Sequence, residues 1–164
     1  TATVKGFEPL YIQRIAQLTN KSNQFNLTTL RCSEDDIRAM AGDKNDLCLC
    51  GKLVDKFGDN GIVTVVAGRQ QGDVLDLTLW LMSCRVLKRG MEDAMMDTVV
   101  AEAAARGVKT IVGHYYPTAK NAMVREFYAQ YDFAKTAEDA DGNTEWTLDV
   151  AAYTPKHPHM KIER

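Results

Sequence analysis

The sequence lacks the features that mark a membrane protein or a nucleic-acid-binding protein. No apolar run approaches the roughly 20 residues that a membrane-spanning helix needs. The N-terminal stretch TATVKGFEPL is neither a signal peptide nor an amphipathic transit peptide. The formal net charge of −2 gives no electrostatic attraction to nucleic acid or to an acidic membrane surface. We therefore expect no membrane segment and no nucleic-acid partner.

Cysteine is scarce, and its spacing predicts neither a zinc site nor a disulfide framework. Cys32, Cys48, Cys50 and Cys84 form no Cys-x-x-Cys pair, and no histidines follow at zinc-finger spacing. In a strand, Cys48 and Cys50 would point to the same face and act as small buried hydrophobic residues. The His-Pro-His stretch at 157–159 is more typical of a tail than of a metal site. We expect no metal and a reducing, cytoplasmic setting.

The composition is that of one soluble globular domain. The chain has 164 residues, of which 45% are hydrophobic and 26% are charged. We predict a domain over residues 1–150 and a peripheral tail or exit linker over residues 151–164, which contain two prolines and no core pattern. Because the chain does not begin with Met, we expect it to be part of a longer protein.

Hydrophobic periodicity in the first half predicts two helices and three strands. Apolar residues between 7 and 18 recur at helical spacing, and a second, short helix follows Ser33, an N-cap, and stops at Gly42. Glycine-containing turns then separate three apolar runs, which predict an antiparallel meander. The predicted strands are 47–57, 62–70 and 74–84.

The second half changes from a period of 2 to a period of 3.6. A helix is predicted from Met91 to Arg106, where Gly107 ends it. A strand over 109–116, a helix over 117–133 and a strand over 144–150 follow.

This order of elements resembles the GNAT acyltransferase fold. The stretch NAMVREFYAQYDF resembles a late GNAT motif in which Asn121 opens a helix. The resemblance implies an α/β (α+β) fold with a mixed, mainly antiparallel central sheet flanked by helices. It also implies a V-shaped gap between the strand before the central helix and the strand after it, which receives an acyl-pantetheine arm.

Four stretches in one order resemble the C-terminal domain of FkbH-like proteins. They lie within residues 7–150 and read QLTNKSNQFNLTT, VDKFGDNGIV, WLMSCRVLKRGMEDAMM and YYPTAKNAMVREFY. FkbH-like proteins are multidomain enzymes of the HAD superfamily that load a glyceryl unit from a bisphosphoglycerate and pass it through a thioester to an acyl carrier protein. The resemblance implies a role in polyketide extender-unit biosynthesis, such as that of methoxymalonyl units.

One departure from that family limits the chemistry. The HAD phosphatase signature, Asp-x-Asp-x-Thr or Val, does not occur in the chain. The chain therefore cannot carry the magnesium-dependent phosphoryl step by itself. We expect it to be the GNAT-like partner of a HAD-type domain in the parent protein, with an acyl carrier protein as a second partner.

Cys84 is the candidate nucleophile. It ends the longest predicted strand, next to Arg85 and shortly before a helix N-terminus, and cations and a helix dipole favour a thiolate. In a GNAT topology His114, at the end of the next strand, would lie beside it in the gap and act as base. The alternative is a buried cysteine at a strand end and a histidine in a surface loop.

The turn after the third strand is the candidate phosphate site. Arg85, Lys88 and Arg89 supply positive charge, and Gly90 lets the backbone approach a phosphate at a helix start. Glu92 stands where the fold usually has a second small residue, so its carboxylate either repels phosphate or complements the helix dipole. We expect the phosphopantetheine arm of a carrier protein, with one phosphodiester, to suit this turn better than CoA.

Five further residues are candidates with a structural alternative. Asn23, Gln24 and Asn26 could recognise the hydroxyls of a glyceryl group, or could cap turns around a buried phenylalanine. Tyr128 falls where many GNAT enzymes place a general acid, or else lies in the core. Asn121 either contacts the cofactor or braces its helix.

Three functions follow from these residues. The first is an acyltransferase-type domain that moves an acyl or glyceryl thioester to or from Cys84. The second is a non-catalytic docking module, with a GNAT shape, for a carrier protein or a HAD domain. The third is an acetyl-CoA-dependent N-acetyltransferase, for which Glu92 is unfavourable.

Overall fold

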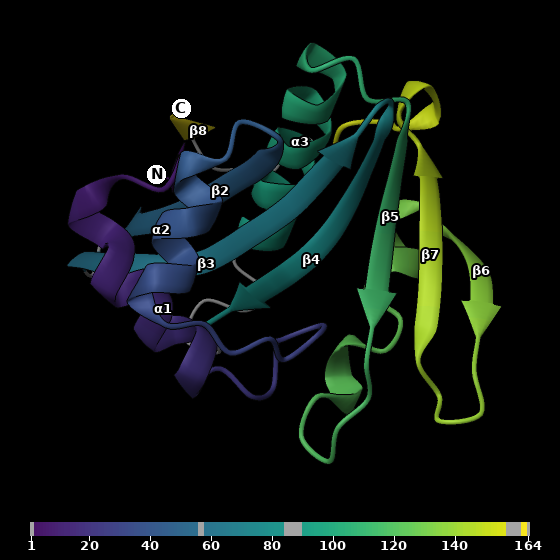
Figure 1. The fold of residues 1–164 in the computed structure, drawn as a ribbon, viewed down its shortest axis with the longest axis horizontal. Helices are drawn as coiled ribbons and strands as arrows, with labels where there is room; N and C mark the ends of the chain where they lie inside the picture. Colours follow the sequence, from purple (N-terminus) through teal and green to yellow (C-terminus); the bar gives the residue numbers. More distant parts are fainter. Residues whose placement is uncertain (1, 56–57, 84–89, 157–161, 164) are drawn as a thin grey trace.

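In the described part of the chain, an eight-stranded sheet forms the centre of the molecule (Figure 1). The computed structural model describes residues 2–55, 58–83, 90–156 and 162–163. The strand order is β6-β7-β5-β4-β3-β2-β1-β8, in which β4–β5 and β1–β8 are parallel pairs and the other pairs are antiparallel. The strands are β1 (Ala2–Lys5), β2 (Asp46–Asp55), β3 (Gly58–Gln71), β4 (Val74–Met82), β5 (Thr110–Tyr115), β6 (Ala134–Glu138), β7 (Thr144–Asp149) and β8 (Ile162–Glu163). The mixed, mainly antiparallel sheet is confirmed.

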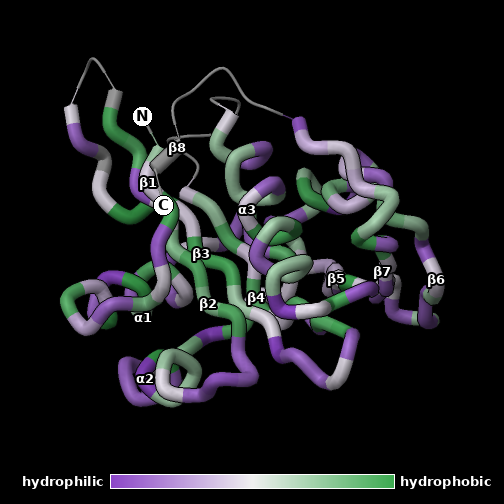
Figure 2. Tube along the Cα trace, turned by 90° about the horizontal axis from the view of Figure 1, so that it is seen from above, coloured by the Kyte–Doolittle hydropathy of each residue, from purple (hydrophilic) through white to green (hydrophobic). Residues whose placement is uncertain are grey.

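Helices cover the two faces of the sheet (Figure 2). On one face lie α1 (Ile12–Lys21), which follows the 3-10 turn η1 (Pro9–Tyr11), and α2 (Glu34–Gly42). The opposite face carries α3 (Met91–Ala105). Each face has its own apolar cluster, so the sheet is buried on both sides over its centre.

The predicted N-cap of α2 is confirmed. The Asp36 N–H donates to the Ser33 hydroxyl at 3.1 Å, and the Ser33 N–H donates to the Asp36 carboxylate at 2.9 Å. This reciprocal pair is a capping box, which satisfies two backbone donors at the helix start.

A bulge in β4 changes which side chains face each core. Thr78 has no partner in the β3–β4 register, because Leu77 pairs with Gly68 and Leu79 pairs with the adjacent Ala67. Leu77 before the bulge and Trp80 after it both belong to the core under α3, whereas Leu79 packs on the α1 side. Four consecutive buried residues end the strand, so the strand is buried on both faces there. The bulged residue Thr78 lies two positions after Asp76, at which the pairing of β4 with β5 ends.

The strands β4 and β5 diverge after this point. Their parallel pairing covers residues 74–76 and 110–112, and beyond it the two ribbons separate (Figure 1). On its other side β5 pairs along its whole length with β7. The sheet therefore has a V-shaped opening, as predicted, and the loop between α1 and α2 reaches into it (Figure 1).

The predicted α-helix over 117–133 is wrong. The chain forms two 3-10 turns there, η3 (Ala122–Val124) and η4 (Tyr128–Tyr131). Five apolar or aromatic side chains of this stretch are buried in the core under α3: Val124, Phe127, Tyr128, Tyr131 and Phe133. Ring packing, including Phe127 against Trp80 at 5.1 Å between centroids, governs this backbone, because tertiary contacts override a weak helix propensity.

The periodicity also missed three strands and the packing of the tail. The strand β1 alternates over only four residues, β8 has two residues, and β6 is exposed throughout, so none has an apolar pattern long enough to predict a strand. After the 3-10 turn η5 (Val150–Ala152), the Tyr153 hydroxyl donates to Asp97 of α3 at 2.6 Å. Val150 and Tyr153 pack against the core under α3, while Ala151, Ala152, Thr154 and Pro155 are exposed, and the domain boundary at residue 150 stays a prediction.

Among the residues that the structure describes, no helix combines the length and apolar character that a membrane crossing requires. Within the same ranges, no three His, Cys, Asp or Glu side chains are grouped as metal ligands.

Candidate functional site

Residues 25–27, the bridging segment, lie between β4 and β5 beyond their point of divergence. The Leu27 N–H donates to the Trp80 carbonyl of β4 at 3.0 Å. Directly after β5, the Tyr116 N–H donates to the Leu27 carbonyl at 2.9 Å. The segment thus connects two strands whose direct pairing has ended.

Two buried asparagines hold the bridging segment. Asn26 donates to the Ser22 carbonyl at 3.1 Å and accepts from the Thr29 N–H at 3.0 Å. Asn121 donates to the Asn26 carbonyl at 3.0 Å and to the Tyr116 carbonyl at 2.9 Å. Both side chains are fully buried, so their amides satisfy backbone groups that water cannot reach.

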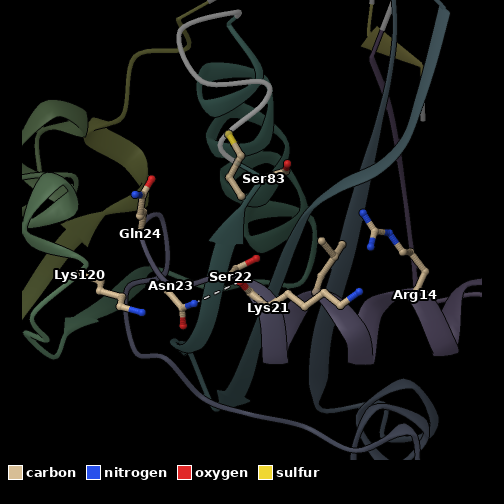
Figure 3. Close-up of a pocket in the computed structure, with 9 residues that line it drawn as sticks. Arg14, Lys21, Ser22, Asn23, Gln24, Ser83 and Lys120 are labelled. Carbon is tan, nitrogen blue, oxygen red and sulfur yellow. Dashed lines mark hydrogen bonds between the residues drawn. The ribbon is translucent and has the colours of Figure 1, made fainter.

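A cavity of about 550 Å³, the basic cavity, lies where β4 ends (Figure 3). Its positive charges come from separate segments, with Arg14 and Lys21 on α1 and Lys120 in the loop after β5. In Figure 3 the Lys120 side chain lies on the opposite side of the cavity from the two α1 cations. The cavity is lined by Arg14, Leu18, Lys21, Ser22, Asn23, Gln24, Met82, Ser83 and Lys120.

The basic cavity suits a small anion with polar groups. No carboxylate is among its described lining residues, and no ion pair within the described residues engages its three cations. The Asn23 side chain accepts from Arg31 at 2.5 Å and donates to the Lys21 carbonyl at 3.4 Å, which fixes its orientation at the rim. Gln24 is exposed beside it. Cations and amides together recognise phosphate or carboxylate oxygens and hydroxyls.

A second cavity of about 310 Å³, the histidine cavity, lies at the β4 bulge. Its lining residues are Thr28, Leu30, Asp76, Thr78, His114 and Tyr116. His114 Nε2 is 2.6 Å from Asp76 Oδ1, and the exposed fractions of the two side chains are 19% and 50%. A carboxylate at this distance orients the imidazole ring.

Several predicted residues fall outside the part of the chain that the structure describes. These are Cys84, Arg85, Lys88 and Arg89. Their neighbour Ser83 lines the basic cavity, so the predicted nucleophile follows a lining residue of that cavity in the sequence.

The expected approach of the strand ends to one another is not present. His114 contacts Asp76, which precedes Met82, the last residue of β4, by about 20 Å along an extended strand. The bridging segment stands between the ends of β4 and β5. The prediction of His114 as the base for Cys84 assumed that the ends of β4 and β5 lie side by side. Because the bridging segment separates these ends, the geometry gives that prediction no support.

Solved structures show what this architecture is. A ribosomal-protein-S18-alanine N-acetyltransferase from Escherichia coli matches with a TM-score of 0.70 at 13% identity, covering 98% of this chain and 100% of that one. A putative GNAT-family acetyltransferase from Desulfovibrio desulfuricans matches with a TM-score of 0.71 at 13% identity, over 92% and 99% of the two chains. The chain has the GNAT fold. A spermidine N-acetyltransferase from Vibrio cholerae, in complex with CoA and spermine, shares this GNAT fold with a TM-score of 0.69 at 10% identity, over 93% and 97%. No protein-family model matches the sequence, and no curated protein matches it.

Within the GNAT fold, three predicted site residues have structural roles. Asn26 and Asn121 bond the backbone around the bridging segment, so neither is carried into the proposed site. Tyr128 is 1% exposed, its ring lies under Gly113, and burial raises the pKa of its hydroxyl. It lines neither the basic cavity nor the histidine cavity, so it is a core residue here.

Gly90 is the N-cap of α3 and has a φ of 84°. This left-handed conformation favours glycine, as a turn into a helix start would require. Glu92 and Asp93 lie in the first turn of α3, where acidic side chains complement the helix dipole.

Sequence reasoning missed the cations of the basic cavity and the partner of His114. Arg14 and Lys21 are seven positions apart on one helix, with Leu18 between them, and this spacing places them on one face. Asp76 is an acid within the most apolar strand, which marks it as an exception to the pattern. The contribution of Lys120 had no sequence signal, because its loop comes from the other half of the chain.

Proposed function

We propose that this GNAT-fold chain handles an acyl thioester at the basic cavity, as the acyl-transfer domain of an FkbH-like protein in polyketide extender-unit biosynthesis. The observation that carries the proposal is the basic cavity, which gathers Asn23 and Gln24 with three cations beside Ser83. Cys84 follows Ser83 in the sequence. Two of the three residues predicted for hydroxyl recognition, Asn23 and Gln24, thus line the same cavity as the end of β4.

The proposed step is a thioester exchange. The Cys84 sulfur attacks the acyl carbonyl carbon, a new carbon–sulfur bond forms, and the bond to the pantetheine sulfur breaks. The proton lost by Cys84 ends on the departing thiol, so the exchange is balanced without an oxidant or a metal. A cationic environment favours the attacking thiolate, and Arg14, Lys21 and Lys120 supply one near the end of β4.

The same cations suit the expected partners. An acyl carrier protein presents a phosphodiester on its arm and an acidic surface, and both are attracted to uncompensated lysine and arginine side chains. Asn23 and Gln24 would contact the hydroxyls of a glyceryl group. A HAD-type domain of the parent protein would supply the phosphoryl chemistry for which this chain lacks the motif.

Intact mass after incubation with a glyceryl or acyl carrier-protein thioester tests the proposal. We expect an adduct of one acyl group on the wild type, none on Cys84→Ala, and an unchanged adduct on the control Cys48→Ala. The double variant Lys21→Gln/Lys120→Gln should form the adduct at least about tenfold more slowly at low salt, whereas the exposed control Lys109→Gln should not. An adduct that persists in Cys84→Ala would contradict the proposal.

The bridging segment favours a second function, the non-catalytic docking module. It occupies the space between the strands that a pantetheine arm would need, and it separates His114 from the end of β4. Carrier-protein binding without any adduct would favour this reading.

One observation favours the third function, an N-acetyltransferase. Asp76 supplies an acid beside His114 that could bind an amine, and solved neighbours include N-acetyltransferases. CoA binding at micromolar strength, measured by calorimetry, would support it.

A further inference from the structure

The gap-facing edge of β4 is already hydrogen-bonded by the chain itself. Its Trp80 carbonyl accepts from Leu27, and its Met82 N–H donates to the Phe25 carbonyl at 3.0 Å. Near the bulge, the Thr28 hydroxyl donates to the Thr78 carbonyl at 2.8 Å. An extended ligand with amide groups, such as a pantetheine arm, would need these same backbone groups.

The bridging segment also separates the two cavities. Residues 22–24, before the segment, line the basic cavity, and Thr28 and Leu30, after it, line the histidine cavity. The side chains of Phe25 and Leu27 point into the core under α3, where they are 5% and 0% exposed. One continuous opening between β4 and β5 is thereby divided into two.

We propose that the bridging segment is a specificity element of this fold. It acts as a short strand between β4 and β5, it excludes CoA and other pantetheine arms from the backbone edge of β4 between Thr78 and Met82, and it confines ligands to one cavity or the other. A ligand in the basic cavity therefore does not reach His114. The inference concerns the end of β4 used by the proposed function, and it holds whether or not Cys84 forms a thioester.

Contacts from both sides make the segment part of the core and not a lid. Its backbone bonds to β4 and to Tyr116, and Asn121 clamps its central carbonyl. The Phe25 ring packs edge-on against Phe127 at 5.3 Å between centroids. A mobile lid has few buried apolar contacts and exposed backbone hydrogen bonds, and the bridging segment has neither property.

Amide hydrogen exchange of the full chain, followed by NMR, tests the inference. The amides of Leu27, Met82 and Tyr116 should exchange within about tenfold of the β3–β4 ladder amides, because all are buried backbone bonds. Addition of CoA at about 1 mM should change their rates less than about twofold. Exchange as fast as that of surface loops, or a rate increase above about tenfold with CoA, would overturn the proposal.

A variant that removes the segment's anchors gives a second measurement. Phe25→Ala/Leu27→Ala should open the gap and bind CoA at least about tenfold more tightly than the wild type in calorimetry. The matched control, Leu49→Ala/Val99→Ala, removes two other side chains of the same core and should gain no CoA binding. A folded Phe25→Ala/Leu27→Ala variant that gains no CoA binding would also overturn the proposal. If the variant does not fold, the exchange rates of the wild-type amides are the measurement that tests the proposal.

The two proposals fail by different readouts. The absence of an adduct on the wild type, or an adduct that persists in Cys84→Ala, contradicts the proposed function, yet neither result bears on the exchange rates of Leu27 and Met82. Deprotection of these amides by CoA removes the specificity element, yet it leaves the mass of the adduct unchanged.

Discussion

At the scale of single residues, Asn121 shows how one buried amide can join distant parts of a chain. Its amide nitrogen donates to the carbonyl of Asn26, in the bridging segment, and to the carbonyl of Tyr116, directly after β5. Its oxygen accepts from the Thr118 N–H at 2.7 Å and from the Tyr115 hydroxyl at 3.3 Å. Because the residue is fully buried, water cannot replace any of these partners.

We expect Asn121→Ala to lower the free energy of unfolding by about 2 to 4 kcal/mol, since it leaves buried backbone groups without a partner. Urea unfolding followed by circular dichroism measures this loss. The exposed control Asn45→Ala should change stability by less than about 0.5 kcal/mol. A loss for Asn121→Ala as small as that of the control would mean that Asn121 does not brace the bridging segment.

At the scale of elements, local signals and tertiary contacts specify different helices. The α2 start is encoded by Ser33 and Asp36, three residues apart, and these residues form the capping box that the spacing permits. The stretch after Asn121 has helical spacing of apolar residues but forms 3-10 turns, because its aromatic rings pack under β4. A cap depends on neighbours in sequence, whereas ring packing depends on segments far apart.

Ser33→Ala should lower the free energy of unfolding by about 1 kcal/mol, because the Asp36 N–H loses its side-chain acceptor. Thermal or urea unfolding detects the change, and Ser33→Asn, which keeps an acceptor, should retain most of the stability. Equal stability of the alanine variant and the wild type would show that the cap contributes nothing in this chain.

At the scale of the whole molecule, burial shifts several titrating groups in one direction. Burial raises the pKa of Cys48 and of Cys50 from 9.0 to about 12 each. It also raises the pKa of the Tyr131 and Tyr153 hydroxyls, with hydrogen bonds to Asp93 and Asp97 as further causes. In each case the folded state keeps a proton that the unfolded state releases at lower pH.

The contribution of these thiols to the free energy of unfolding should therefore be fully present below pH 9. It should fall as the pH rises from about 9 to about 12, since the unfolded chain then binds fewer protons than the folded one. Urea midpoints between pH 7 and pH 10.5 measure this decline. The double variant Cys48→Ala/Cys50→Ala should show a shallower decline, relative to its own midpoint at pH 7, than the wild type. A wild-type midpoint that does not change with pH would contradict the raised pKa values of these thiols.

The sequence by itself determined the order of the main elements, the hairpins, the α2 cap and the resemblance to the GNAT fold. These features depend on residues close together along the chain, where spacing and turn chemistry act directly. The burial of Cys50, and the packing of Cys48 beside it, also followed from their alternation in one strand.

Tertiary structure alone decided which polar residues meet. Asn23 and Gln24 reach the basic cavity because the β4 strand ends beside α1, and Lys120 joins them from the other half of the chain. His114 meets Asp76 and not the end of β4, because the bridging segment inserts where the two strands diverge. His114 and Asp76 are 38 positions apart and Asn26 and Asn121 are 95 positions apart, and no local periodicity encodes contacts over such separations.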